Sequence, residues 1–374
     1  MRALIDYRAA LRERSGVGEY AHQLVRALLS AYPHGDLALT LFSSSWKDRL
    51  VPDADLAGAA VVDRRVPVSL LNLAWHRAEW PPIEWLSGAA FDVAHSLHPL
   101  LLPARRAAQV VTIHDLNFLA HPERTRAEIR RDYPRLAADH ARRADHIIVV
   151  SPFTAREVER HFGVPAERIS VCAPGAPDWA PRATPPPDGG YVLFLGTLEP
   201  RKNVGGLLDA YERLAARRRD LPPLVLAGKA TPEATPWLER LTREPLSRLV
   251  RHIGYVDPNA RRGVYEGARV LVQPSFDEGF GLPVLEAMTL GVPVIAANAG
   301  ALPDVLGDAG LLVEPGDPDA LGGAIERMLD DDALRAAASA RGVLRAQTFR
   351  WDRTAACTHE AYQLAIEHKR CASA

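Results

Sequence analysis

Two adjacent cations, Arg201 and Lys202, follow the apolar run 191–195 (YVLFL) at the junction between a predicted strand and a predicted helix. The chain holds only four lysines against 41 arginines, so a lysine at this junction stands out. Arginine offers a two-pronged donor and lysine a point charge, a combination suited to a diphosphate. Exposed cations often have no role beyond their contact with solvent. A position in a loop at the carboxyl end of a buried strand instead favours a role in ligand binding. Asn203 is predicted to cap the following helix.

A pair of carboxylates, Glu278 and Glu286, brackets a second predicted helix entrance after the apolar run 269–273. Gly279 and Gly281 make the turn between them, and Glu286 lies one helical turn inside. Carboxylates accept hydrogen bonds from sugar hydroxyls, while the N–H groups of the turn donate others. The alternative is that Glu278 stabilises the helix N-terminus and Glu286 is an incidental surface charge. That alternative leaves the Gly-Phe-Gly turn unexplained.

Two weaker patterns lie in the first half of the chain. Gly16 and Gly18 open a predicted helix at 18–31, where free N–H groups and the helix dipole favour an anion. A dinucleotide fingerprint would put these glycines directly after the first strand, but nine residues separate Asp6 from Gly16, so NAD binding is disfavoured. His114 follows the run 109–113 (QVVTI), a position where histidine is more often structural.

The elements that must position these residues alternate along the chain. Short apolar runs predict buried strands at 2–6, 37–42, 91–95, 109–113, 146–150, 191–195, 223–227, 250–254, 269–273 and 292–296. Amphipathic stretches predict helices at 18–31, 125–143, 203–218, 260–267, 282–290, 317–329 and 351–369. This alternation predicts parallel sheets covered on both faces.

The fold class predicted is therefore α/β, with two Rossmann-like doubly wound domains facing across a cleft. We expect an N-terminal, acceptor-side domain at 1–180, a Pro/Gly-rich linker at 181–190 and a nucleotide-sugar-binding domain at 191–350. The C-terminal helix, 351–374, is expected to pack back on the N-terminal domain. Ligands of such sheets bind outside the carboxyl ends of the strands.

Composition excludes several classes of protein. The net charge of −1 argues against a nucleic-acid partner. No run approaches the ~20 apolar residues of a membrane span, and the chain reaches a strand at once, so we expect a cytoplasmic protein without a signal peptide. Three cysteines are too few and too scattered to predict a disulfide framework or a zinc site.

Peripheral contact with the inner membrane face would use the arginine-rich stretch 124–143, for which a solvated helix face is the favoured interpretation. Trp75, Trp80 and Trp85 are expected to pack in the interior.

The order of these motifs resembles a known family. The glycine pair near the N-terminus, His-Asp-Leu in the middle, then E-P-R-K-N and E-G-F-G-L-P-x-x-E-A are similar to the retaining GT-B glycosyltransferases with an E-x7-E motif. Within them the chain most resembles bacterial mannosyltransferase-like enzymes of cell-surface polysaccharide assembly. The resemblance covers nearly the whole chain.

The resemblance implies a role for each charged side chain. Arg201 and Lys202 match the cations that hold the donor diphosphate. Glu278 matches the carboxylate that contacts the donor sugar, and Glu286 matches the one that binds the ribose hydroxyls. His114 matches the histidine beside the anomeric carbon. The remaining donor contacts implied by the resemblance are mostly backbone groups: Gly16 for the phosphate, Gly279, Phe280 and Gly281 for sugar and phosphate, and Gly228, Lys229, Tyr255 and Val256 for the base.

The predicted function is a retaining, metal-independent transfer of a hexose, mannose from GDP-mannose, to a glycan or lipid-linked acceptor. No cofactor is expected beyond the nucleotide-sugar co-substrate, a GDP- or UDP-sugar. A covalent intermediate would need a carboxylate against the anomeric carbon, and none is obviously placed there in the first domain, where Asp115 is the only nearby candidate. We therefore hypothesise front-face substitution. Two alternatives stay open: a nucleotide-sugar epimerase on the same fold, and a non-catalytic nucleotide-binding protein.

Overall fold

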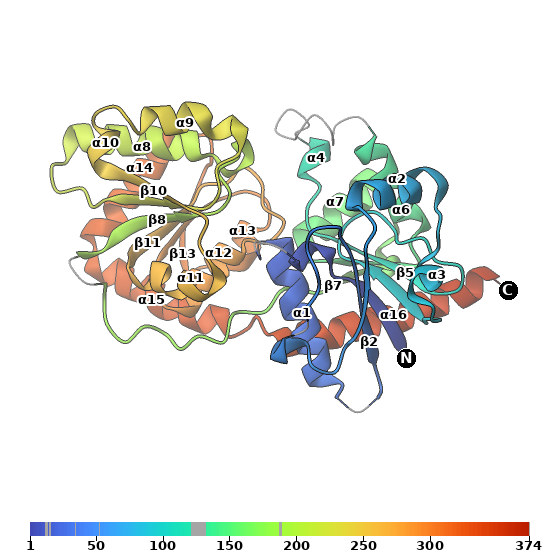
Figure 1. Ribbon diagram of the computed structural model, residues 1–374. Helices are drawn as coiled ribbons and strands as arrows, with labels where there is room; N and C mark the ends of the chain where they lie inside the picture. Colours follow the sequence, from blue (N-terminus) through green and yellow to red (C-terminus); the bar gives the residue numbers. More distant parts are fainter. Residues whose placement is uncertain are drawn as a thin grey trace. The chain divides into compact units, whose positions relative to one another are not determined.

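The computed structural model describes the chain except residues 12, 13, 15, 34, 52, 121–131, 187, 188 and 374, and the side chains of 120 and 373. It comprises two compact units (Figure 1). Unit 1 is Met1–Gly175 together with Arg350–Ala374, and unit 2 is Ala176–Phe349. The change of unit thus precedes the segment 181–190 that we predicted as a linker. Arg182 in that segment donates to the carbonyl oxygen of Ala268, which anchors it in unit 2 (2.6 Å).

Unit 1 is built on a seven-stranded parallel sheet in the order β3-β2-β1-β4-β5-β6-β7. Its strands are β1 (Arg2–Asp6), β2 (Ala38–Ser44), β3 (Ala60–Arg64), β4 (Val93–Ser96), β5 (Ala108–Ile113), β6 (His146–Val149) and β7 (Ile169–Val171). Its α-helices are α1 (Val17–Ala31), α2 (Val68–Ala78), α3 (Ile83–Ser87), α4 (Asn117–Ala120), α6 (Tyr133–Arg143), α7 (Pro152–Phe162) and α16 (Trp351–Ser373).

Unit 2 is built on a six-stranded parallel sheet in the order β10-β9-β8-β11-β12-β13. Its strands are β8 (Tyr191–Leu195), β9 (Leu224–Ala227), β10 (Val250–Gly254), β11 (Ala268–Gln273), β12 (Val294–Ala297) and β13 (Gly310–Val313). Its α-helices are α8 (Val204–Arg217), α9 (Thr235–Arg240), α10 (Leu246–Leu249), α11 (Pro258–Glu266), α12 (Leu282–Thr289), α13 (Leu302–Leu306), α14 (Pro318–Asp330) and α15 (Asp332–Ala346).

Both sheets share one winding. In each, the first three strands run outward in one direction and the fourth returns to pair with the first. The order therefore reverses between β1 and β4 in unit 1, and between β8 and β11 in unit 2. These reversals are the switch points at which doubly wound sheets bind ligands. The prediction of an α/β chain with two Rossmann-like doubly wound domains is confirmed.

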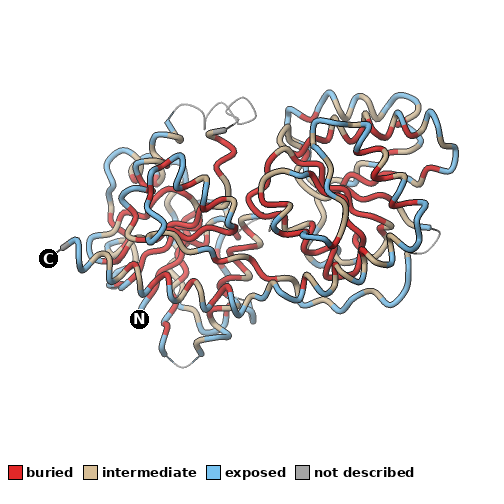
Figure 2. The backbone as a smooth tube through the Cα atoms, turned by 180° about the vertical axis from the view of Figure 1, so that it is seen from behind, coloured by how far each residue is buried: buried red, intermediate tan, exposed pale blue. Residues whose placement is uncertain are grey.

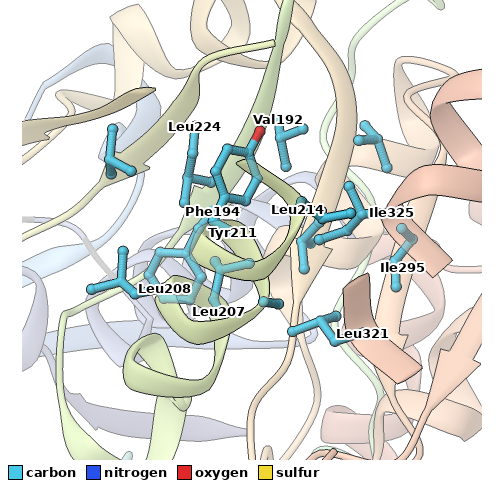
Figure 3. Packing of buried hydrophobic residues seen from close by; sticks show 14 of the residues in the cluster. Val192, Phe194, Leu207, Leu208, Tyr211, Leu214, Leu224, Ile295, Leu321 and Ile325 are labelled. Atoms are coloured by element: carbon cyan, nitrogen blue, oxygen red, sulfur yellow. The ribbon is translucent and has the colours of Figure 1, made fainter. Parts of the chain in front are cut away.

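The core of unit 2 shows why its strands read as continuous apolar runs. α8 and α14 pack together on one face of the sheet, and α12 and α15 lie on the other (Figure 1). The central strands are buried and the loops exposed (Figure 2). Phe194 of β8 and Tyr211 of α8 belong to one cluster that also contains Leu207, Leu214, Ile295, Leu321 and Ile325 (Figure 3). The Tyr211 hydroxyl donates to the carbonyl oxygen of Pro222, which satisfies the polar atom inside this cluster (2.7 Å).

Several helices and strands were not predicted from the sequence. β3, β7 and β13 are edge strands whose residues are mostly half-buried or exposed, so they lack a clear apolar run. The helices α2, α7 and α15 were also missed, as were the shorter α3, α4, α9, α10 and α13. The C-terminal part of the predicted helix 125–143 is α6 (Tyr133–Arg143). Residues 125–131 of that prediction lie outside the described part of the chain.

The structure contains one disulfide that the sequence pattern did not predict. Cys172, one residue after β7, forms a disulfide with Cys357 of α16, across 185 residues of sequence. α16 lies against α1, β5, β6 and β7, which brings the two cysteines together within unit 1. Cys371 is a free thiol. Sequence distance hid this pairing, because everything in unit 2 is inserted between the two positions.

The tryptophan prediction was right for one residue of three. Trp75 is 2% exposed in the core, whereas Trp80 and Trp85 are 57% and 56% exposed. The two exposed rings pack edge to face against each other (6.3 Å between centroids), and Arg105 stacks over Trp85. Among the described residues, no helix is both long and apolar enough to span a membrane.

Candidate active site

The loop after β8 is joined to the loop after β11, because these strands are neighbours at the switch point of unit 2. Asn203 caps α8 by accepting from the backbone N–H of Gly206, as predicted (3.2 Å). Its amide also donates to the carbonyl oxygen of Pro274, just beyond β11 (3.1 Å). The backbone N–H of Phe276 donates to the carbonyl oxygen of Arg201 (2.8 Å). These bonds set the cations of one loop beside the carboxylate of the other.

Glu278 is the centre of a buried ion cluster. Its Oε1 atom accepts from the Lys202 ammonium, from Gln273 Nε2 (2.9 Å) and from Ser275 Oγ (2.9 Å). Its Oε2 atom lies 3.3 Å from a guanidinium nitrogen of Arg201. Lys202 is 7% exposed and Glu278 5% exposed, so this pair is shielded from water. The structure therefore brings together three of the four side chains that the sequence singled out for catalysis.

The charges of this cluster are balanced. Although burial alone raises the pKa of Glu278, Lys202 and Arg201 together lower it to about 2, so the carboxylate is ionised. Burial and the neighbouring Arg201 lower the pKa of Lys202, and Glu278 opposes that shift. Arg201 also donates to Glu199 (2.6 Å). Two cations thus face two carboxylates, and Glu199 is a member of the cluster that the sequence patterns did not reveal.

The backbone at Gly300 packs closely against the backbone of the Glu278 loop. Gly300 has a φ of +60°, and a Cβ atom there would lie 2.6 Å from the carbonyl oxygen of Glu278. The backbone N–H of Ala301 donates to that same oxygen (2.9 Å). A residue larger than glycine at position 300 would push the carboxylate loop out of place.

Glu286 lies on α12 and has partners of its own. Arg261 donates to its Oε1 atom and the Tyr265 hydroxyl donates to its Oε2 atom, both at 2.7 Å. Both partners come from α11, four residues apart. The carboxylate is 6% exposed, which excludes the alternative of an incidental surface charge.

The turn into α12 is tightly packed. Gly281 caps the helix with a φ of +107°, and a Cβ atom there would lie 2.7 Å from a methyl group of Leu302. The side chain of Phe280 is 6% exposed and packs edge to face against Phe349. Gly279 and Gly281 therefore flank a buried aromatic anchor, which holds the backbone of the turn in place.

The four residues predicted for the base lie together at the ends of β9 and β10. The N–H of Gly228 donates to the carbonyl oxygen of Gly254 (2.7 Å), and His252 Nε2 lies 2.8 Å from the carbonyl oxygen of Gly228. Lys229, exposed, accepts from the backbone N–H of Leu198 through its own carbonyl (2.7 Å). Gly228 thus helps to hold the two strand ends together. Tyr255 and Val256, which follow Gly254 in the sequence, are half-buried.

Gly16 and His114 lie in unit 1, linked by Tyr20. Gly16 caps α1 with a φ of +52°, and its carbonyl accepts from the backbone N–H of Tyr20. The Tyr20 ring packs edge to face against His114 (4.9 Å between centroids). Burial lowers the pKa of His114 to about 4, so its ring is neutral near pH 7, and Nε2 lies 3.2 Å from the carbonyl oxygen of Leu97.

A polar cluster at the switch point of unit 1 was missed. Asp6 ends β1 and pairs with Arg8 (2.6 Å), which also donates to Asn72 (2.8 Å). His98, beyond β4, lies 3.6 Å from the same carboxylate. Burial raises the pKa of Asp6, but Arg8 and His98 together hold it well below its usual range. The sequence did contain a pattern that could have indicated this cluster: the first strand ends in an aspartate, and an arginine follows two residues later.

No group of three or more histidine, cysteine, aspartate or glutamate side chains suited to a metal ion occurs within the described part of the chain. The charged clusters of both units instead combine carboxylates with arginine, lysine or histidine.

Comparison with known proteins identifies the family. A model of group 1 glycosyl transferases matches residues 177–344, and a model of glycosyltransferase family 4 matches residues 14–178. The chain is 38% identical over 374 residues to the O-antigen chain mannosyltransferase B of Escherichia coli. The alignment covers 94% of this chain and 96% of that relative. The chain belongs to the group 1 glycosyltransferases. It is a glycosyltransferase of the mannosyltransferase-like kind, and this decides against the epimerase and the non-catalytic binding protein.

Solved structures show the fold of this glycosyltransferase. Sucrose-phosphate synthase from Thermosynechococcus elongatus superposes with a TM-score of 0.78 at 23% identity, covering 97% of this chain and 98% of that one. WaaG, a glycosyltransferase involved in lipopolysaccharide biosynthesis, gives a TM-score of 0.71 at 17% identity, covering 96% and 98%. The glycosyltransferase therefore has the GT-B fold.

Proposed function

We propose that this glycosyltransferase moves mannose from GDP-mannose, with retention and without a metal ion, to a glycan or lipid-linked acceptor in surface polysaccharide assembly. The observation that carries the proposal is the ion cluster at the switch point of unit 2, in which half-buried Arg201 and buried Lys202 contact the buried Glu278. The choice of mannose is supported by the name of the Escherichia coli relative, to which the chain is similar over nearly its full length.

The cluster suits a leaving diphosphate. Before the donor binds, the charges of Arg201 and Lys202 are balanced by Glu199 and Glu278. A diphosphate placed against the two cations would add negative charge to the cluster, and Glu278 would then exchange part of its contacts for hydroxyls of the donor sugar. Cations fixed in a buried site stabilise developing charge more than the same cations do in water. They would supply the positive charge that a divalent metal supplies elsewhere.

The proposed reaction takes place on one face of the donor sugar. The bond between the anomeric carbon and the diphosphate oxygen breaks while a bond to the acceptor oxygen forms on the same face. The acceptor's proton passes to the departing diphosphate, so the products are the new glycoside and the nucleoside diphosphate. His114, neutral near pH 7, is the group of unit 1 that we assign to the reaction centre. Gly16 is assigned to the phosphate, and the residues at the ends of β9 and β10 to the base.

A donor screen tests the proposal. Thermal midpoints are measured with GDP-mannose and with UDP-, ADP- and dTDP-sugars. At about 100 times its Kd, a ligand of the native state stabilises by about 2.7 kcal/mol, or roughly 5–10 °C for a unit of this size. We expect the largest shift with GDP-mannose, unchanged by EDTA, and a product whose anomeric configuration by NMR matches that of the donor. A largest shift with another base refutes the donor, loss of turnover in EDTA refutes metal independence, and no shift with any sugar nucleotide refutes the donor site.

A further inference from the structure

Two side chains outside the E-x7-E motif grip its second carboxylate. Arg261 donates to one oxygen of Glu286 and the Tyr265 hydroxyl to the other, both at 2.7 Å. Arg261 is 8% exposed and Tyr265 fully buried, so neither bond competes with bulk water. Both residues come from α11, whereas Glu286 belongs to α12.

The geometry of this grip restricts the carboxylate. Residues four positions apart lie on one face of a helix, so a single rigid element presents both donors. Because each donor holds a different oxygen, the carboxylate loses its freedom to rotate about the bond that joins it to the side chain. The pKa of Tyr265 is raised well above its usual value by burial and by the charge of Glu286, so the hydroxyl stays protonated and donates.

Stability alone is a poor reason for such an arrangement. A buried ion pair contributes little more than apolar side chains of similar volume would, since both charges must be stripped of water. α11 and α12 are already covered by apolar contacts, with Trp179 packed against Tyr265 and Leu285 and Met288 fully buried. An oriented carboxylate is instead what a ligand with two adjacent hydroxyls requires, because their hydrogen bonds depend on direction.

We propose that Arg261 and Tyr265 are positioning residues that hold the Glu286 carboxylate in the orientation that receives the 2′- and 3′-hydroxyls of the donor ribose. This inference rests on the proposed role of Glu286 in donor binding. Through these two residues, α11 would help to determine the choice between ribose and deoxyribose, acting on the Glu286 carboxylate rather than on the sugar itself.

The test compares a ribonucleoside diphosphate with its 2′-deoxy form. The Kd values of GDP and 2′-deoxy-GDP, or of the pair whose base the donor screen selects, are measured by calorimetry. For the unaltered protein we expect the ribose form to bind roughly ten to a hundred times more tightly, the worth of one hydrogen bond to a charged group. In Tyr265→Phe this ratio should fall at least roughly threefold, and the KM for the donor should rise with kcat nearly unchanged.

Tyr211→Phe is the matched control. Tyr211 is a second fully buried tyrosine of unit 2 whose hydroxyl also donates one hydrogen bond, to Pro222 (2.7 Å). Removing its hydroxyl should lower stability in the same way but leave the ratio at the unaltered value. Arg261→Lys is a second arm, because lysine keeps the charge but loses the planar fork, and its ratio should also fall.

The outcomes separate this inference from the proposed function. If Glu286→Gln lowers the ratio but Tyr265→Phe and Arg261→Lys do not, the positioning role is refuted and the ribose role of Glu286 stands. If Glu286→Gln itself leaves the ratio unchanged, the assignment of Glu286 to ribose falls. If Tyr265→Phe does not fold, Arg261→Lys decides alone.

Discussion

Replacing Lys202 by methionine separates its contribution to catalysis from its contribution to stability. Methionine has a similar length without the charge, so the variant leaves an ionised Glu278 in a site where both partners are less than 10% exposed. Breaking a buried pair costs about 3–5 kcal/mol. We expect the lower end, about 3 kcal/mol, because Arg201 still pairs with the carboxylate, and Gln273 and Ser275 still donate to it. That corresponds to a fall in thermal midpoint of roughly 6–12 °C for a unit of this size.

Turnover should fall further than stability explains. A donor aimed at developing charge contributes about 10²- to 10³-fold to the rate. We therefore expect Lys202→Met to lower kcat by about that factor, measured as release of nucleoside diphosphate at saturating donor and at a temperature where the variant is folded.

The double variant, Lys202→Met with Glu278→Gln, is the decisive comparison. Removing both charges also removes the buried carboxylate that Lys202→Met leaves with Arg201 as its remaining cation, so most of the lost midpoint should return, while kcat stays low. Turnover of Lys202→Met within about threefold of the unaltered enzyme would refute the role of Lys202 in stabilising the leaving group. A double variant no more stable than the single one would refute the ion-pair account of its stability.

Three further predictions concern stability and redox state. The pKa of Glu278 is lowered from 4.5 to about 2, so its carboxylate stabilises the fold above pH 4.5, and this contribution, at most about 3 kcal/mol, is lost as the pH falls toward 2. Urea unfolding should show the advantage of the unaltered enzyme over Glu278→Gln shrinking between pH 5 and pH 3, and a constant gap would contradict this. A Cβ atom at Gly228 would lie 2.0 Å from the carbonyl oxygen of Gly196, with φ at +140°, so Gly228→Ala should cost about 3 kcal/mol or more. Gly16→Ala, with nothing within 4 Å of the added atom, should unfold at a clearly higher temperature than Gly228→Ala, and equal midpoints would argue against the clash. Under non-reducing conditions the denatured chain should show one reactive thiol, Cys371, and three after reduction; three without reductant would rule out the disulfide in solution.

Local patterns were sufficient for much of the fold. The central strands are buried on both faces, so they read as continuous apolar runs, and their alternation with helices predicted the doubly wound class. Asn203 was predicted as a helix cap from its residue type and position alone, because a cap bonds to a backbone group only three residues away. Edge strands such as β13 lack a buried run and left no comparable pattern.

Within the site, the residue types at the ends of the strands could be identified without the structure. The order of the motifs indicated the family, and Arg201, Lys202, Glu278 and Glu286 could each be singled out from the motif that contains them. Their partners could not. Glu278 and Lys202 are 76 positions apart, and they meet because β8 and β11 are neighbours in the sheet.

The pairing of the charges, by contrast, depends on the three-dimensional fold. Glu286 looked like a surface charge or a ribose ligand, and it proved to be a buried carboxylate held by Arg261 and Tyr265. Asp6 and His98 meet at the corresponding switch point of unit 1. Cys172 and Cys357 form a disulfide although the whole sequence of unit 2 separates them. The physical reason is the same in each case. Periodicity along the chain records which face of an element is buried, whereas the partner of a buried charge depends on the order in which the strands pair.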